Sequence, residues 1–234
     1  MDLSSLSIFD PLMWANLAKI IALNIVLSGD NAVVIALACR ALAPEQRAKG
    51  IALGAGVAVV LRVVFTVLIA SLLNAPFLRI IGAGLLIWIA VKLVVEDGES
   101  DEDSIAASSK LWKAVQTVAI ADIVMSLDNV LAIAAVAKDS IPLLVAGLVI
   151  SIPLIVLGAS LITSLLTRFP ILVWAGAALL GWVAGEMFDS DPWLIGRFGA
   201  ETLHSLEYPA AILGALLVVG LGYFIKARRP DPAH

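Results

Sequence analysis

The chain has 234 residues, 61% of them hydrophobic and 15% charged, and its mean hydropathy of +1.03 is far above that of soluble domains. This composition excludes a soluble enzyme, and the long apolar runs predict membrane-spanning helices rather than a barrel of alternating strands. The net charge of −4 argues against a nucleic-acid-binding protein, and one cysteine with two histidines excludes a Cys/His metal cluster.

Seven segments have about the 20 apolar residues that a helix needs to cross a bilayer core. In chain order, we predict these spans at residues 12–39, 50–73, 77–95, 111–137, 141–166, 170–188 and 208–227. Most lysines and arginines lie at span ends that share one side of the membrane. By the positive-inside rule, we expect a multi-pass protein of the inner (plasma) membrane with its N-terminus outside and its C-terminus in the cytoplasm.

Two polar segments interrupt the predicted spans. The acidic segment 96–110 joins the third span to the fourth, and we expect it to be a flexible cytoplasmic linker. The segment 189–207 is expected on the external side, where His204 would be a surface residue. We treat residues 1–234 as a single transmembrane domain.

The first and fourth predicted spans contain the same motif. Residues 24–36 (NIVLSGDNAVVIA) align without a gap with residues 122–134 (DIVMSLDNVLAIA), and residues 85–92 match residues 179–186. Because each copy has three spans, an odd number, the copies cross the membrane in opposite directions. The sequence therefore predicts an all-α fold with a three-helix repeat (12–95), an inverted second repeat (111–188) and one extra helix (208–227).

Polar residues recur inside both copies of the motif. We expect Asp30 and Asp122 at similar depth on the cytoplasmic side of the membrane centre, and Asp128 on the external side. Each carboxylate at that depth costs roughly 2.5–3.5 kcal/mol, so a cation must offset the three. The nearby oxygen-bearing side chains are Asn31 and Asn129, with Asn24, Ser28 and Ser126 as secondary candidates.

Such a set of oxygen ligands with negative charge suits a hard divalent ion, namely Mn²⁺, Ca²⁺ or Mg²⁺. In straight helices, however, Asp30 and Asp128 would point about 100° away from the stripes formed by the other polar residues of their motifs. We therefore expect the helices to bend or unwind near Ser28-Gly29 and near Ser126-Leu127, which would also free carbonyl oxygens as ligands.

Several other charged residues lie within or near the spans, and each has two interpretations. Arg62 in the second span, Lys92 in the third and Lys19 in the first could pair with the aspartates and simply hold the bundle together. Arg62 could instead neutralise the acidic site when no ion is bound. Glu186, near the external end of the sixth span, is either an access gate or an interfacial side chain.

The two motifs resemble those of a known family. Gly29-Asp30-Asn31 and Ser126-Leu127-Asp128-Asn129, with Asp122 six residues upstream and seven spans, resemble the TerC family, particularly its YjbE-like branch. The resemblance extends from the first span to the seventh. It implies a metal-ion exporter with Mn²⁺ as the exported ion, and it implies that Asp30, Asp122 and Asp128 are metal ligands.

The sequence thus favours a transporter, not an enzyme, that exports divalent metal ions by alternating access and has membrane lipid, the metal ion and protons as partners. Moving two charges outward costs about 4.6 kcal/mol per 100 mV. No nucleotide-binding loop is present in the sequence, so we expect exchange for protons, which would compete with the metal for the same carboxylates.

Two other functions are open to the same residues. A membrane metal-binding sensor, or a metal-loading partner of secreted enzymes, would use the same ligands without moving the ion. An intramembrane aspartyl protease would need two membrane aspartates, but its usual Gly-x-Gly-Asp signature is absent because Leu27-Ser28-Gly29-Asp30 lacks the first glycine.

Overall fold

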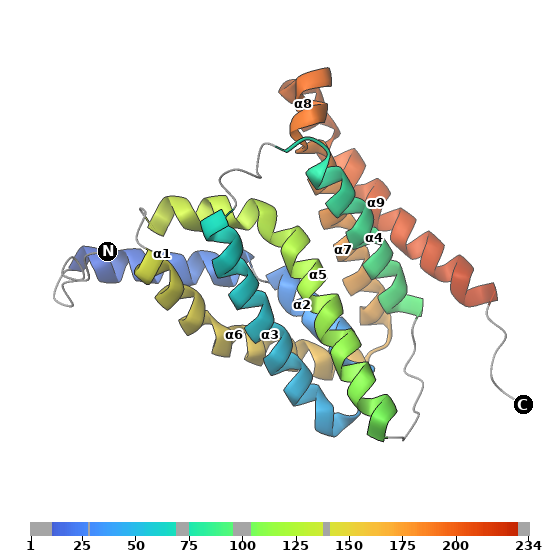
Figure 1. Ribbon diagram of the computed structural model, residues 1–234. Helices are drawn as coiled ribbons and strands as arrows, with labels where there is room; N and C mark the ends of the chain where they lie inside the picture. The colour runs from blue at the N-terminus through green and yellow to red at the C-terminus, as the bar shows by residue number, and fades with distance from the viewer. Residues whose placement is uncertain (1–10, 28, 69–74, 96–103, 138–140, 229–234) are drawn as a thin grey trace, which may run out of the picture.

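The computed structural model describes residues 11–27, 29–68, 75–95, 104–137 and 141–228, with the side chains of 11–13, 23–27, 66–68, 104–107, 127–137 and 141–144 left undescribed. Within these ranges the chain forms nine helices and no strand (Figure 1). The helices are α1 (Pro11–Leu27), α2 (Gly29–Cys39), α3 (Pro44–Leu68), α4 (Leu78–Val95), α5 (Ser104–Ala137), α6 (Ile141–Arg168), α7 (Ile171–Asp189), α8 (Pro192–Phe198) and α9 (Ala200–Arg228).

Five helices in the described ranges are long and apolar enough to cross a membrane. These spans are Pro44–Phe65, Leu78–Val95, Val145–Arg168, Ile171–Asp189 and Ala200–Arg228. They coincide with the second, third, fifth, sixth and seventh predicted spans. The structure therefore agrees with the predicted all-helical class, and its several long apolar helices suit a multi-pass membrane protein.

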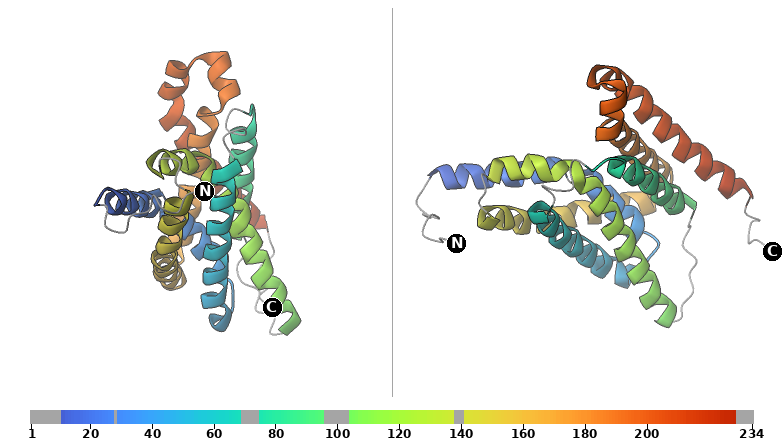
Figure 2. Two further views of the ribbon diagram at one scale, coloured as in Figure 1. Left: turned by 60° about the vertical axis from the view of Figure 1, so that its left-hand side comes forward. Right: turned by 45° about the horizontal axis from the view of Figure 1, so that its top comes forward.

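The first predicted span is divided into two helices. Helix α1 ends at Leu27 and α2 begins at Gly29, and the two run in different directions (Figures 1 and 2), as expected for a bend at this point, although Ser28 itself lies outside the described residues. With 17 and 11 residues, α1 and α2 are each shorter than a full membrane crossing. In the second motif, α5 remains helical through Ser126-Leu127, so it is not unwound there, and the helix changes direction along its length (Figures 1 and 2).

The polar segments are more helical than their hydropathy suggests. Helix α5 begins at Ser104, so residues 104–110 of the expected flexible linker are helical. In the expected external segment 189–207, α8 and the first turns of α9 are formed. Helix α8 has its own start signal, because the Asp191 side chain accepts a hydrogen bond from Trp193 N (2.9 Å) and Pro192 occupies the first turn.

The helices pack in two groups. Helices α4, α7 and α9 contact one another in one group, while α3 packs on α5, and α6 packs on α1, α2 and α3 in the other. Figures 1 and 2 show α4, α7 and α9 on one side of the molecule and α1, α3 and α6 on the other. Contacts of α5 with α4 and of α2 with α7 join the groups.

Glycines let α7 and α9 approach closely. A Cβ atom at Gly181 would lie 2.5 Å from the carbonyl oxygen of Gly214, and Gly185 lies as tightly against Ala210. Small residues at such a contact let two helix backbones meet, which is how many membrane helices associate. The glycine contact fixes α9 onto α7 and makes the α4–α7–α9 group tightly packed.

A buried aspartate fastens the start of α4 to the turn between α7 and α8. Asp191 is fully buried, and its carboxylate accepts hydrogen bonds from Phe77 N (3.2 Å) and Arg79 N (3.1 Å). The Arg79 guanidinium donates to the carbonyl oxygen of Ser190, and the Phe77 and Trp193 rings stack at 4.8 Å. This contact ties together segments more than 100 residues apart in the sequence.

The glycine contact generates a stability prediction with a matched control on the same helix. Gly214→Ala places a methyl group against the carbonyl oxygen of Gly181, so we expect a loss of about 1–3 kcal/mol in unfolding free energy. Gly220→Ala is exposed and has open space around the new methyl group, so it should be neutral or gain up to about 1 kcal/mol. Thermal unfolding in detergent measures both, and equal effects of the two variants would contradict the close α7–α9 contact.

Candidate functional site

A buried ion pair lies between α3 and α5. Arg62 Nη2 is 2.8 Å from Asp122 Oδ1, and the two side chains are only 2% and 3% exposed. The Ser126 hydroxyl donates to Asp122 Oδ2 at 3.1 Å, and Arg62 Nε donates to Ser126 Oγ at 3.3 Å. Arg62, Asp122 and Ser126 thus form a connected network in which both carboxylate oxygens have partners.

The α-helical spacing explains how this network forms. Asp122 and Ser126 are four residues apart, so they share one face of α5, and that face packs against α3. The sequence left two roles open for Arg62, a structural pair with an aspartate or neutralisation of the empty acidic site, and the structure shows that it pairs with Asp122. A buried carboxylate inside an apolar bundle requires such a partner, because an unpaired charge there is strongly destabilising.

Asn31 on α2 lies beside this ion pair with an unsatisfied amide. Its side chain is 5% exposed, and in the described part of the chain neither Oδ1 nor Nδ2 has a hydrogen-bond partner. Together with Asp122, it lines a buried gap too narrow for a water molecule, whose other walls are Val34, Ile35, Ala58 and Val118. A buried polar group without a partner costs about 1–3 kcal/mol, so this amide calls for an explanation.

Asp30 extends the network toward solvent. It is the first acidic residue of α2, and its Oδ1 accepts a hydrogen bond from Asn31 N at 2.8 Å. Asp30 is partly buried and interacts electrostatically with both Arg62 and Asp122. We call Asp30, Asn31, Arg62, Asp122 and Ser126 the central polar cluster.

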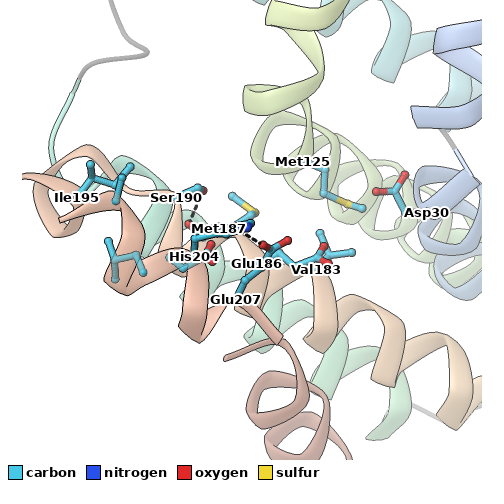
Figure 3. A pocket seen from close by; sticks show the side chains of 12 residues that line it. Asp30, Met125, Val183, Glu186, Met187, Ser190, Ile195, His204 and Glu207 are labelled. Carbon is cyan, nitrogen blue, oxygen red and sulfur yellow. Dashed lines mark hydrogen bonds and ion pairs between the residues drawn. The ribbon is translucent and has the colours of Figure 1, made fainter. Parts of the chain in front are cut away.

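A cleft of about 600 Å³ opens from Asp30 between the two helix groups. Figure 3 shows Asp30 and Met125 on one wall, facing Val183, Glu186 and Met187 on the other. The cleft continues past Asp189, Ser190, Ile195, Ala200, Leu203, His204 and Glu207, toward α8 and the start of α9. One wall therefore belongs to α2 and α5, and the other to α7, α8 and α9.

Glu186 lies inside this cleft. Its Oε1 accepts a hydrogen bond from Trp182 Nε1 at 2.6 Å, which fixes the carboxylate one turn from the tryptophan. His204 is 85% exposed and pairs with Glu207 at 3.0 Å, so the prediction that it is a surface residue is confirmed. Both Asp189 and Glu207 line the cleft, which makes its wall acidic.

The other predicted site residues lie elsewhere or outside the described side chains. Lys92 lies over the Trp88 ring at 5.3 Å, and Lys19 is exposed. Ser28 and the side chains of Asn24, Asp128 and Asn129 lie outside the described residues, although the backbone at Asp128 and Asn129 is helical. Among the described side chains, no three of His, Cys, Asp or Glu gather closely enough to hold a metal ion.

Sequence reasoning missed Met125, Asp189 and Glu207 as residues of the cleft. The spacing of Glu186 and Asp189 was a usable signal, because residues three apart share one face of a helix. Met125 precedes Ser126 in the repeated motif, but an apolar residue in an apolar helix gives no sign that it faces a cleft. Glu207 was hidden because the segment 189–207 was expected to be an external connection rather than the start of α9.

Comparisons with known proteins show that this chain is similar to other integral membrane proteins. The model of the integral membrane protein TerC family matches residues 9–230. The uncharacterized membrane protein YjbE of Bacillus subtilis is 40% identical over 176 residues, which cover 75% of this chain and 80% of YjbE. The uncharacterized membrane protein YceF of the same organism is 26% identical over 94% of this chain and 86% of its own length.

A longer relative matches over part of its length only. The UPF0053 inner membrane protein YoaE of Escherichia coli is 27% identical over 71% of this chain and 35% of its own length. No solved structure matches the chain. Since the family model covers nearly all of the sequence and YjbE is 40% identical over most of both chains, this chain belongs to the TerC family of integral membrane proteins.

Proposed function

We propose that this protein is a membrane transporter that exports divalent metal ions from the cytoplasm, with Mn²⁺ as its cargo. The observation that carries the proposal is the unsatisfied amide of Asn31, buried beside Asp122. Buried polar groups in proteins nearly always have partners, and a cation coordinated by Asn31 Oδ1 would supply the missing interaction for that oxygen. The unsatisfied amide of Asn31 thus supports a site that binds its ligand in another conformation of the protein.

The chemistry of the central polar cluster suits a hard cation. Asp30 and Asp122 offer carboxylate oxygens, Asn31 an amide oxygen and Ser126 a hydroxyl. Oxygen donors with negative charge select Mn²⁺, Mg²⁺ or Ca²⁺ over the metals that prefer sulfur or imidazole. We propose that Asp128 and Asn129 complete the ligand set, with Asn24 and Ser28 at its margin, and the choice of Mn²⁺ among these metals follows the family resemblance.

We propose seven spans, built as two inverted three-helix repeats followed by α9. Packing between the proposed repeats supports this arrangement, because α3 packs on α5 while their counterparts α6 and α1–α2 also pack together. The third helices of the two proposed repeats, α4 and α7, contact each other as well. In the proposed topology the protein lies in the inner membrane with its N-terminus outside the cell, its C-terminus in the cytoplasm and α8 on the external side.

During alternating access, the metal ion would move through the cleft between the two helix groups. Asp30 lies at one wall of the cleft, and the far end of the cleft reaches α8 on the proposed external side. Rocking of one helix group against the other would open this path or close it. Glu186, held by Trp182 on the opposite wall, would be the first carboxylate that a departing ion meets, in keeping with a role at the gate.

The transport prediction concerns metal uptake into inside-out vesicles, where export becomes uptake. Wild-type protein should accumulate Mn²⁺, and Asp30→Asn and Asp128→Asn should lower the initial rate at least about tenfold because each removes a charged ligand. The control is Glu45→Gln, which changes an exposed carboxylate at the start of α3 and should transport normally. Flow-dialysis or isotope uptake measures the rates for Mn²⁺, Ca²⁺ and Mg²⁺.

Three outcomes separate the rival functions. If both aspartate variants fold and transport like the wild type, the proposed ligands are wrong. If Mn²⁺ stabilises the wild type but never accumulates, the protein is a sensor or a metal-loading partner and not a transporter. An acidic vesicle lumen should accelerate uptake if protons move in exchange, and a rate indifferent to the pH gradient would exclude that coupling.

The unsatisfied amide gives a second prediction, in which stability and metal binding change in opposite directions. Asn31→Ala removes a buried group without partners, so the metal-free variant should be as stable as the wild type or more stable. The same change should abolish the rise in melting temperature that Mn²⁺ produces in the wild type. Thr163→Val, which changes a buried hydroxyl on α6 bonded to Ala159 O (2.7 Å), is the matched control and should keep the metal response. A clearly lower melting temperature for metal-free Asn31→Ala would contradict the geometry.

A further inference from the structure

Both oxygens of Asp122 are already engaged in the described structure. Oδ1 accepts from the Arg62 guanidinium at 2.8 Å, and Oδ2 accepts from the Ser126 hydroxyl at 3.1 Å. A divalent ion would have to come within about 2.0–2.6 Å of one of these oxygens. It would then stand next to a fixed positive charge, where the low dielectric of the bundle makes repulsion much stronger than in water.

We propose that Arg62 is a built-in competing cation that exchanges places with the transported metal ion at Asp122. The inference rests on the proposed function and deepens it, because it assigns the residue that regulates the same site. Arg62 occupies Asp122 when no metal is bound, and the arriving ion takes over the carboxylate as the guanidinium leaves. Arg62 is therefore a positioning residue that acts through Asp122.

The exchange has a consequence for the transport cycle. A carrier that returns without cargo must carry its empty ligands back, and unneutralised carboxylates resist that movement in an apolar surrounding. Arg62 neutralises Asp122 in the empty state without any ion from solution. With Arg62 at Asp122 the carrier can release its ion and return without a metal ion, whether or not protons occupy the other carboxylates, so that it performs net transport rather than only exchange of one metal ion for another.

The exchange also couples ion binding to helix movement. Arg62 is 2% exposed and belongs to α3, whereas Asp122 and Ser126 belong to α5. The ion pair is a buried contact between these two helices, so a guanidinium that leaves Asp122 removes part of what holds α3 on α5. Binding of the ion at Asp122 thus loosens the contact that holds α3 on α5.

The difference between the two repeats agrees with this pairing of acid and base. The position aligned with Asp122 is Asn24, so the first copy lacks that carboxylate. Helix α6, the counterpart of α3 in the proposed repeat, contains no lysine or arginine from Ile141 to Thr167. The repeat interface that contains Asp122 thus has an arginine on its second helix, and the equivalent interface with Asn24 has no lysine or arginine over these residues of α6.

The test separates exchange from net flux in the purified, reconstituted protein. Arg62→Gln should bind Mn²⁺ about tenfold more tightly than the wild type, since the competitor is gone. It should still exchange radioactive Mn²⁺ between equal concentrations on the two sides of a liposome, while net uptake falls at least about tenfold. Arg62→Lys keeps the charge, so its affinity should stay near that of the wild type and part of its net uptake should return.

Chemical rescue tests whether the positive charge itself matters, because an added guanidinium would not change Mn²⁺ binding if Arg62 were purely structural. In Arg62→Ala, millimolar methylguanidinium should weaken Mn²⁺ binding competitively and restore part of the net uptake. The uncharged analogue methylurea, at the same concentration, should do neither. In the wild type, methylguanidinium should leave Mn²⁺ binding unchanged because Arg62 already fills the position.

The outcomes distinguish this inference from the proposed function. If Arg62→Gln binds Mn²⁺ as weakly as the wild type or more weakly, or keeps full net uptake, Arg62 is not a competing cation even though the protein transports metal. If wild-type protein neither binds nor moves a divalent ion, the proposed function and this inference fall together. If Arg62→Gln does not fold, Arg62→Lys decides the matter, because loss of its exchange together with its net uptake would overturn the inference.

Discussion

The buried ion pair of Arg62 and Asp122 is the interaction on which the rest of the site depends. Placing the two charges in an apolar bundle costs several kcal/mol per ion, and their mutual attraction offsets this only when the remaining hydrogen bonds are satisfied. Ser126 provides that satisfaction on both sides, because it donates to Asp122 and accepts from Arg62. The pair fixes how α3 faces α5, and that contact in turn sets the wall of the gap in which Asn31 lies.

The second feature that shapes the site is the change of helix direction between α1 and α2 (Figure 1). Gly29 begins α2, and the residue aligned with it in the other motif copy is Leu127, around which α5 remains helical. Gly29 is itself helical and has no positive φ, but glycine is a poor helix former, whereas leucine is a strong one. The difference places Asp30 and Asn31 in the first turn of a new helix, where free backbone N–H groups favour a carboxylate acceptor.

Much of this arrangement could be predicted from the sequence, and the parts that could not have physical reasons. Hydropathy located the long apolar helices, and the need to turn Asp30 toward the other polar residues predicted the break at Ser28-Gly29. Charge balance identified Arg62 as a possible partner of the aspartates, but it could not show that Arg62 pairs with Asp122, because that pairing depends on how α3 packs on α5. Asp189 and Glu207 were missed as residues of the cleft because hydropathy treats a polar stretch such as 189–207 as a connection, whereas Asp191 caps α8 there and α9 already begins at Ala200.

The two helix groups differ in what holds them together, and this difference bears on the proposed movement. Glycine contacts between α7 and α9 bring backbone against backbone, so sliding there would meet immediate steric clash. Between the groups lies an open cleft lined by Asp30 on one wall and by Glu186, Asp189 and Glu207 on the other. Ionised carboxylates that face one another across a cleft repel, while a cation between them attracts both walls. A passing divalent ion would therefore draw the groups together and its departure would let them separate, which links the position of the ion to the width of its own path.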